Sequence, residues 1–195
     1  MIQFILGGAR SGKSRYAESL AVRHEANSKT VFYIATAQAN FTGTQTDLSK
    51  EETGSIKAND PLNIDQEMQD RIERHQSDRP QHWQTLEAPI KLAERLAELD
   101  DSQHCIMVDC LTLWTLNLIE SQRLQEERSA LLALLPNLKA ELILVSNEVG
   151  LGIIPMGKLT RTFVDELGWL HQDIAKIADE VTFVTAGLPM KLKAV

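Results

Sequence analysis

Residues 7–14 read Gly7-Gly8-Ala9-Arg10-Ser11-Gly12-Lys13-Ser14 and fit the phosphate-binding pattern G-x-x-x-x-G-K-[ST]. The glycines of this pattern let the backbone curl, so that successive N–H groups point at phosphate oxygens. The lysine reaches the β- and γ-phosphates, and the last hydroxyl ligates Mg²⁺. We therefore expect all eight residues to bind a nucleotide, with Lys13 acting in catalysis and Ser14 holding Mg²⁺.

The sequence on either side of this pattern predicts a strand before it and a helix after it, which is the setting of a phosphate loop. An apolar run at 3–6 predicts a buried strand before the glycines, and apolar spacing over 13–24 predicts a helix after them. Continuous apolar runs, typical of strands covered on both faces, recur at 30–35, 105–109, 142–146 and 181–185. Helical patterns lie between them at 90–99, at 111–135 with a break, and at 159–178. The alternation predicts an α/β fold with a mainly parallel central sheet flanked by helices.

A carboxylate for the metal is expected at the end of a neighbouring strand. The run Cys105-Ile-Met-Val-Asp109 closes in an acid, so Asp109 is our candidate second Mg²⁺ ligand and nucleotide-binding residue. The alternative is that Asp109 caps the helix that starts near Leu111.

The length and net charge of the chain limit the classes of protein to which it can belong. The chain has 195 residues and a net charge of −7, which predicts one domain and argues against nucleic-acid binding. No apolar run is long enough for a membrane span, and the first residues lack a basic leader, so we expect a cytoplasmic protein. Cys105 and Cys110 fit reduced core thiols.

Residues 40–65 do not fit the pattern of the rest. The segment has few apolar residues and no clear period, and so long a loop is uncommon inside a compact domain. We expect a single domain over 1–195 with a flexible insertion at 40–65; a lid over an active site is the alternative that the sequence leaves open.

Several further motifs accompany the phosphate loop. Taken together and in this order, they resemble the bifunctional adenosylcobinamide kinase/adenosylcobinamide-phosphate guanylyltransferase family of cobalamin biosynthesis. The motifs are GGARSGKS at 7–14, YIATAQA at 33–39, RIERHQSDRP at 71–80, HWQTLEAP at 82–89, DCLTLW at 109–114, SNEVGLGIIP at 146–155 and AGLP at 186–189. The 40–65 segment departs from the family, being longer than its usual link.

The resemblance implies a P-loop fold of the RecA type, a homotrimer and two reactions. In the first, ATP or GTP phosphorylates adenosylcobinamide. In the second, GTP transfers GMP to adenosylcobinamide phosphate through a guanylylated histidine, which gives adenosylcobinamide-GDP.

The motif match assigns the histidine to His75. A neutral imidazole can attack an α-phosphorus, since its ordinary pKa lies near 6.5. The alternative is a solvated histidine near a helix end. The same motif match implies that the nucleotide is also bound by Gln76, Ser77, Asp78 and Arg79.

Other candidates follow strands. Glu87 matches a position that the family uses around the guanine nucleotide; the alternative is a surface acid at a strand end. Ala35, Thr36 and Ala37 follow a strand and could offer backbone groups to the nucleotide; the alternative is a plain strand exit. Glu148 could take a proton or hold metal; the alternative is a plain Asn-Glu-x-Gly turn.

Two other functions remain open. A simple small-molecule P-loop kinase would make His75 incidental. A non-enzymatic nucleotide-dependent switch is the third possibility, although the Asn-Lys-x-Asp pattern that reads guanine does not occur in the sequence.

Overall fold

A computed structural model describes residues 1–37 and 80–194. Residues 1–37 and 83–195 group by their contacts into one compact unit. The segment 40–65 lies outside the described residues, so the predicted insertion stays a prediction.

The five apolar runs form the strands that the sequence predicts. Four of them have fully buried interiors, because helices cover both faces of the sheet. They are β1 (Ile2–Gly7), β2 (Thr30–Ala35), β4 (His104–Asp109), β5 (Glu141–Asn147) and β6 (Glu180–Thr185).

Two further strands complete a seven-stranded sheet in the order β3-β2-β4-β5-β1-β6-β7. Every neighbouring pair is parallel except β6 and β7. Neither β3 (Gln84–Glu87) nor β7 (Leu188–Lys193) is among the apolar runs predicted as strands. Both lie at sheet edges and are largely exposed, so burial does not impose an apolar run on them.

The helices also lie where the apolar spacing predicts. The expected break in 111–135 falls between α4 and α5, where Gln122 adopts a positive φ of 58°. The helices are α1 (Lys13–Ala26), α3 (Leu92–Glu98), α4 (Leu111–Glu120), α5 (Leu124–Leu134) and α6 (Lys158–Ile177), with a 3₁₀ turn η1 (Leu135–Asn137) after α5.

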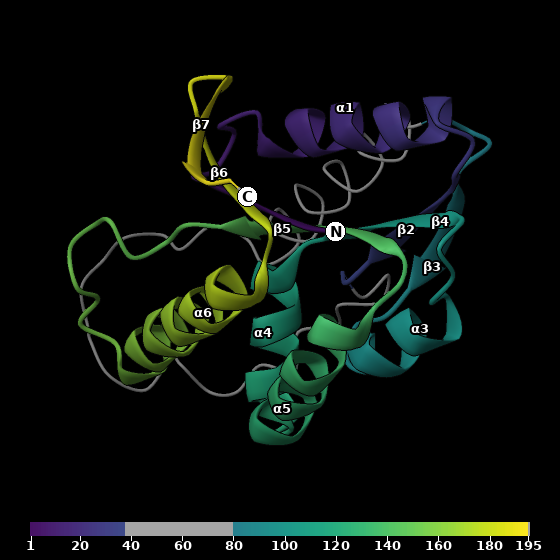
Figure 1. The fold of residues 1–195 in the computed structure, drawn as a ribbon. Coiled ribbons are helices and arrows are strands. Elements are labelled where there is room, and N and C mark those ends of the chain that lie inside the picture. The colour runs from purple at the N-terminus through teal and green to yellow at the C-terminus, as the bar shows by residue number, and fades with distance from the viewer. Residues whose placement is uncertain (38–79, 195) are drawn as a thin grey trace. The chain divides into compact units, whose positions relative to one another are not determined.

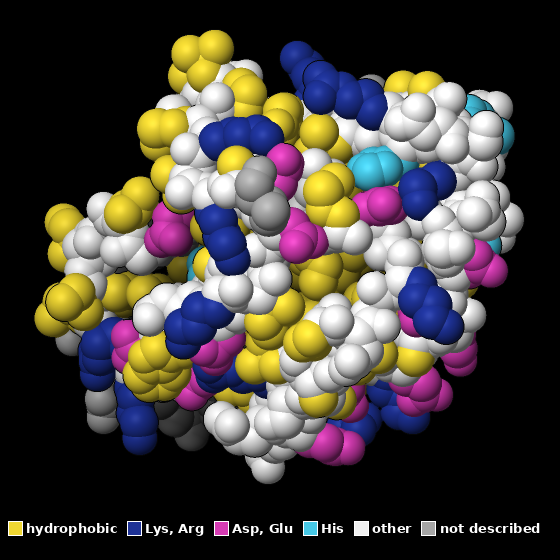
Figure 2. Space-filling model, viewed as in Figure 1, with side chains coloured by type: hydrophobic (Ala, Val, Ile, Leu, Met, Phe, Trp, Pro, Cys, Tyr) yellow, Lys and Arg dark blue, Asp and Glu magenta, His cyan; other side chains and the backbone are white. Residues whose placement is uncertain are grey.

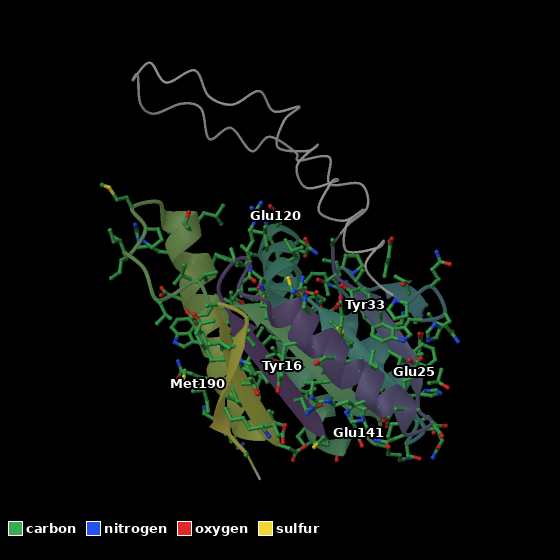
Figure 3. The ribbon with its side chains drawn as sticks, turned by 90° about the horizontal axis from the view of Figure 1, so that it is seen from above. Tyr16, Glu25, Tyr33, Glu120, Glu141 and Met190 are labelled. Carbon is green, nitrogen blue, oxygen red and sulfur yellow. The ribbon has the colours of Figure 1, made fainter. Side chains whose placement is uncertain are left out.

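Two hydrophobic cores lie on opposite faces of the sheet, with α1 on one side and α3 to α6 on the other (Figure 1). Helix α1 covers one face, where its Ala17 and Leu20 pack against strand residues such as Met107 and Val145. Helices α3 to α6 cover the other face around Trp114, which is fully buried. Figure 3 looks down on α1 from Tyr16 near its start to Glu25 near its end. The prediction of an α/β P-loop fold with a mainly parallel sheet flanked by helices is confirmed.

Among the helices in the described part of the chain, none is long and apolar enough to cross a membrane.

Candidate nucleotide site

The candidate residues gather at the carboxyl edge of the sheet, because the parallel strands all end there. The register places Glu87 beside Ala35 and Ala35 beside Asp109. On the next strand, β5, Asn147 lies at the carboxyl end beside Gly7, which ends β1. Open α/β sheets bind ligands at this edge.

The same residues share one face of the sheet. Successive side chains of a strand point to opposite faces. Met107 and Val145 pack in the core on the α1 side, so Asp109 and Asn147, two residues further along, fall on that side too. Leu86 packs against the opposite core, so its neighbour Glu87 also faces the α1 side. The carboxylates of Glu87 and Asp109 therefore lie on the face where α1 begins.

The phosphate loop takes the conformation that its glycines permit. Arg10 and Gly12 have positive φ values of 55° and 94°. The Ser11 N–H donates to the Gly8 carbonyl at 3.3 Å, and the Lys13 Nζ donates to the same carbonyl at 3.3 Å. From the β6–β7 turn, the Gly187 N–H donates to the Ser11 carbonyl at 2.8 Å. The loop is thus closed on itself and tied to the end of the sheet.

The start of α1 is open to an anion. Its N-cap residue is Gly12, and no side chain of the described residues caps this end or places an acid in the first turn. The first N–H groups of a helix have no partner inside the helix. Together with the positive end of the helix dipole, they are donors suited to an anion, and the binding of one at Lys13 and Ser14 stays a prediction.

Gly7 is required by packing. A Cβ built on it would meet the backbone carbonyl of Val184 and lie 2.5 Å from the Ser11 Oγ. The loop therefore approaches β6 more closely than any other residue type would allow.

Ala35 and Thr36 use their polar groups inside the protein. The Thr36 hydroxyl accepts the Cys110 N–H at 2.9 Å and donates to the Cys110 carbonyl at 2.7 Å. The Thr36 backbone carbonyl accepts from the Asn117 side-chain amide at 2.9 Å, and the Ala35 backbone carbonyl accepts from the Ala88 N–H. Thr36 is fully buried and fixes the turn that follows Asp109.

The two cysteines are free and buried, as expected. Burial raises the pKa of Cys105 to about 12, and burial together with the neighbouring Asp109 raises the pKa of Cys110 to about 11. Both are therefore neutral thiols at pH 7.

One group of side chains beneath this edge was not predicted from the sequence. The His171 Nε2 lies 2.8 Å from the Ser146 Oγ, which lies 3.2 Å from the Thr112 Oγ1. The other ring nitrogen of His171 faces Glu148 at 3.7 Å. Burial lowers the pKa of His171 to about 4, although Glu148 opposes the shift, so the ring is neutral at pH 7.

The Glu148 side chain also closes a local turn, because its Oε1 accepts the Gly150 N–H at 2.6 Å. The turn that the sequence left open as an alternative is therefore present.

His75, Gln76, Ser77, Asp78 and Arg79 lie outside the described residues, so their predicted roles are neither confirmed nor contradicted.

Comparison with known proteins identifies relatives of this chain. The family model for "Cobinamide kinase / cobinamide phosphate guanyltransferase" matches residues 3–192. The chain is 48% identical to the "Bifunctional adenosylcobalamin biosynthesis protein CobP" of Pseudomonas aeruginosa, covering 99% of this chain and 98% of the relative. It is 32% identical to the "Bifunctional adenosylcobalamin biosynthesis protein CobU" of Escherichia coli, covering 99% and 100%.

Among solved structures, the flagellar accessory protein FlaH from Methanocaldococcus jannaschii aligns with 99% of this chain and 78% of its own, with a TM-score of 0.46 and 14% identity. The sequence matches span both the phosphate loop and the segment that holds His75. The chain belongs to the cobinamide kinase/cobinamide phosphate guanyltransferase family.

Proposed function

We propose that this protein phosphorylates adenosylcobinamide with ATP or GTP and then transfers GMP from GTP to the product, giving adenosylcobinamide-GDP. The observation that supports the proposal is the family match over residues 3–192. The matched range includes the phosphate loop, which lies at the carboxyl edge of the sheet and leads into the uncapped start of α1.

The phosphate loop serves the kinase step. The N–H groups at the start of α1 and the Lys13 ammonium bind the β- and γ-phosphates and stabilise the charge that spreads over the transferring group. The substrate hydroxyl oxygen forms a bond to the γ-phosphorus, the bond from that phosphorus to the β–γ bridging oxygen breaks, and the hydroxyl proton passes to water. The products are the phosphate ester and a nucleoside diphosphate.

Magnesium fits the donor set at this edge. Ser14 and Asp109 would hold it, and both offer the oxygen ligands that Mg²⁺ prefers. Within residues 1–37 and 80–194, no cluster of three His, Cys, Asp or Glu side chains could hold a metal unaided. Phosphate oxygens and water would therefore complete the shell, as is usual for this ion. When bound, the ion neutralises phosphate charge.

His75 serves the second step in this proposal. Its ring nitrogen forms a bond to the α-phosphorus of GTP and pyrophosphate leaves. A phosphate oxygen of adenosylcobinamide phosphate then displaces the histidine, which returns the free enzyme. Gln76, Ser77, Asp78, Arg79 and Glu87 would contact the guanine nucleotide, and Ala37 remains a candidate beside them. The position of Glu87 at the nucleotide edge supports its inclusion.

A homotrimer is part of the proposal, and exposed apolar surface supports it. Figure 2 shows hydrophobic side chains on the side where Figure 1 has β7 and the loop before α6. The exposed residues there are Leu151, Ile153, Ile154, Met156, Leu188, Met190 and Leu192. We propose no nucleic-acid partner, and a cytoplasmic location stays a prediction.

Labelling from GTP tests the second step. GTP carrying label in its α-phosphate should label the protein through a phosphoramidate, which is labile in acid and stable in alkali. The His75→Ala variant should take up no label, whereas His104→Gln, at the opposite end of β4 from Asp109, should label as wild type does. Equal labelling of His75→Ala would refute the assigned nucleophile.

The same experiment separates the alternatives. A single-activity kinase would phosphorylate adenosylcobinamide from γ-labelled nucleotide and never take up α-label. A nucleotide-dependent switch would change conformation with nucleotide and turn over no cobinamide.

A further inference from the structure

Residues 149–157, which follow β5 and lead into α6, form a loop without a single polar side chain; we call it the apolar loop. Its sequence is Val-Gly-Leu-Gly-Ile-Ile-Pro-Met-Gly. Four of its large side chains lie in solvent, since Leu151, Ile153, Ile154 and Met156 are 81%, 97%, 78% and 97% exposed. Figure 1 shows the loop between β5 and α6, and Figure 2 shows hydrophobic side chains on that side. Single exposed apolar residues are ordinary, but contiguous ones mark binding sites.

The apolar loop is held in place at both ends. Near its start, the Gly150 N–H donates to the Glu148 Oε1 at 2.6 Å. Near its end, the Arg161 guanidinium, from the start of α6, donates to the Pro155 carbonyl at 3.1 Å and also to the Met156 carbonyl. An anchored backbone therefore presents the apolar side chains to solvent, so a ligand that covers them has less of the chain to order.

The apolar loop begins beside the phosphate loop. Asn147, the last residue of β5, lies next to Gly7 in the register, and the Glu148 N–H donates to the Gly7 carbonyl at 3.0 Å. Glu148 is also held from behind, because its carboxylate faces the Nδ1 of the buried His171 at 3.7 Å. A large ligand on the apolar loop therefore lies at the same edge of the sheet as a nucleotide on the phosphate loop.

The substrate of the proposed kinase step is too large for the hollows of the described residues. One hollow, of about 410 Å³, is lined by Met1 and Asp179 at the opposite edge of the sheet. Another, of about 260 Å³, lies between Glu87 and α3. Neither is lined by a residue of the phosphate loop. Pockets of about 300–1,000 Å³ enclose drug-sized ligands, and a corrinoid is larger than these. Within the described part of the chain, its bulk would lie on open surface.

We propose that the apolar loop is the docking site for the corrin macrocycle of adenosylcobinamide. The inference rests on the proposed kinase activity. A corrin is a flat macrocycle with methyl-bearing apolar faces, and the hydroxyl that accepts the phosphate lies at the end of one side arm. The ring covers the aliphatic side chains of the loop while the arm extends to the phosphate loop. Strand β7, with its own exposed apolar side chains, is left for the subunit contact proposed above.

Steady-state kinetics of adenosylcobinamide phosphorylation at saturating nucleotide test the docking site. Ile153→Ser and Met156→Ser should each raise the KM for adenosylcobinamide about tenfold, because each removes the burial of one large apolar side chain. The kcat and the Kd for nucleotide should keep their wild-type values. Both side chains are almost fully exposed, so neither substitution removes packing from the fold. Val22→Ser, at an exposed apolar residue of α1, is the matched control and should keep the wild-type KM.

The anchoring of the loop has its own readout. Arg161→Met keeps every apolar side chain of the loop and releases the Pro155 and Met156 carbonyls. It should raise the KM for adenosylcobinamide about threefold, because binding must then also order the loop.

The outcomes separate the occupants of the loop and the two proposals. An active wild type with an unchanged KM in Ile153→Ser and Met156→Ser overturns the inference and leaves the proposed function standing. Analytical ultracentrifugation of these variants should give the wild-type mass; a smaller assembly would assign the loop to a contact between subunits and also overturn the inference. A wild type that phosphorylates no cobinamide overturns the proposed function, and the inference falls with it.

Discussion

The buried His171 makes stability depend on pH in a direction that the structure fixes. Burial lowers its pKa from 6.5 to about 4, so the unfolded chain binds a proton there more readily than the folded chain does. Stability rises with pH wherever the unfolded state holds more protons. This contribution is therefore fully present above pH 6.5 and is lost progressively as the pH falls toward 4.

The size of the effect follows from the same values. Between pH 7.5 and pH 5, linkage gives a loss of about 2 kcal/mol in the free energy of unfolding from His171. His24 adds to it with the same sign, because burial also lowers its pKa, against an opposing effect of Glu141.

Urea denaturation at a series of pH values measures the loss. The wild type should lose about 2 kcal/mol or more over this range, and His171→Gln should lose about 2 kcal/mol less than the wild type does. If His171→Gln follows the wild-type curve, the ring is not buried and neutral in the way described.

Three further predictions concern the loop, the turn after β4 and the thiols. Gly7→Ala should lower the free energy of unfolding by about 1–3 kcal/mol and weaken nucleotide binding, because its Cβ would meet the Val184 carbonyl; thermal denaturation and nucleotide titration measure the two effects. Thr36→Val should cost about 1–3 kcal/mol in chemical denaturation, since the Cys110 N–H loses its acceptor. Cys105 and Cys110 should react with an aromatic disulfide reagent only after denaturant is added, because both are buried and carry raised pKa values.

Each of these predictions can fail. Gly168→Ala, whose Cβ would meet nothing within 4 Å, is the control for Gly7→Ala, and equal effects of the two would refute the packing argument. A Thr36→Val variant as stable as wild type would show that the hydroxyl is dispensable. Rapid labelling of the native thiols would contradict their burial.

The sequence predicts the parts of the fold that have a local signature. The phosphate loop, the start of α1 at Lys13 and the five apolar strands follow from residues that are neighbours in the chain. Strands β3 and β7 were missed because sheet edges do not require apolar runs.

The candidate site also contains residues that local sequence predicts and residues whose partners lie far away in the chain. Asp109 could be predicted because an acid closes an apolar run, and the structure places it on the α1 face. The partners of His171 could not be predicted, since Ser146 lies 25 residues away and meets it only when α6 packs against the sheet. The role of Thr36 also depends on a partner far away, Cys110, 74 residues along the chain.

The most direct test of the account is the mass of the products formed from adenosylcobinamide and GTP. The account predicts first the addition of one phosphate and then the addition of GMP to that phosphate, with Lys13→Ala blocking the first step. A product that stops at the phosphate, or a substrate recovered unchanged by the wild-type protein, would contradict it.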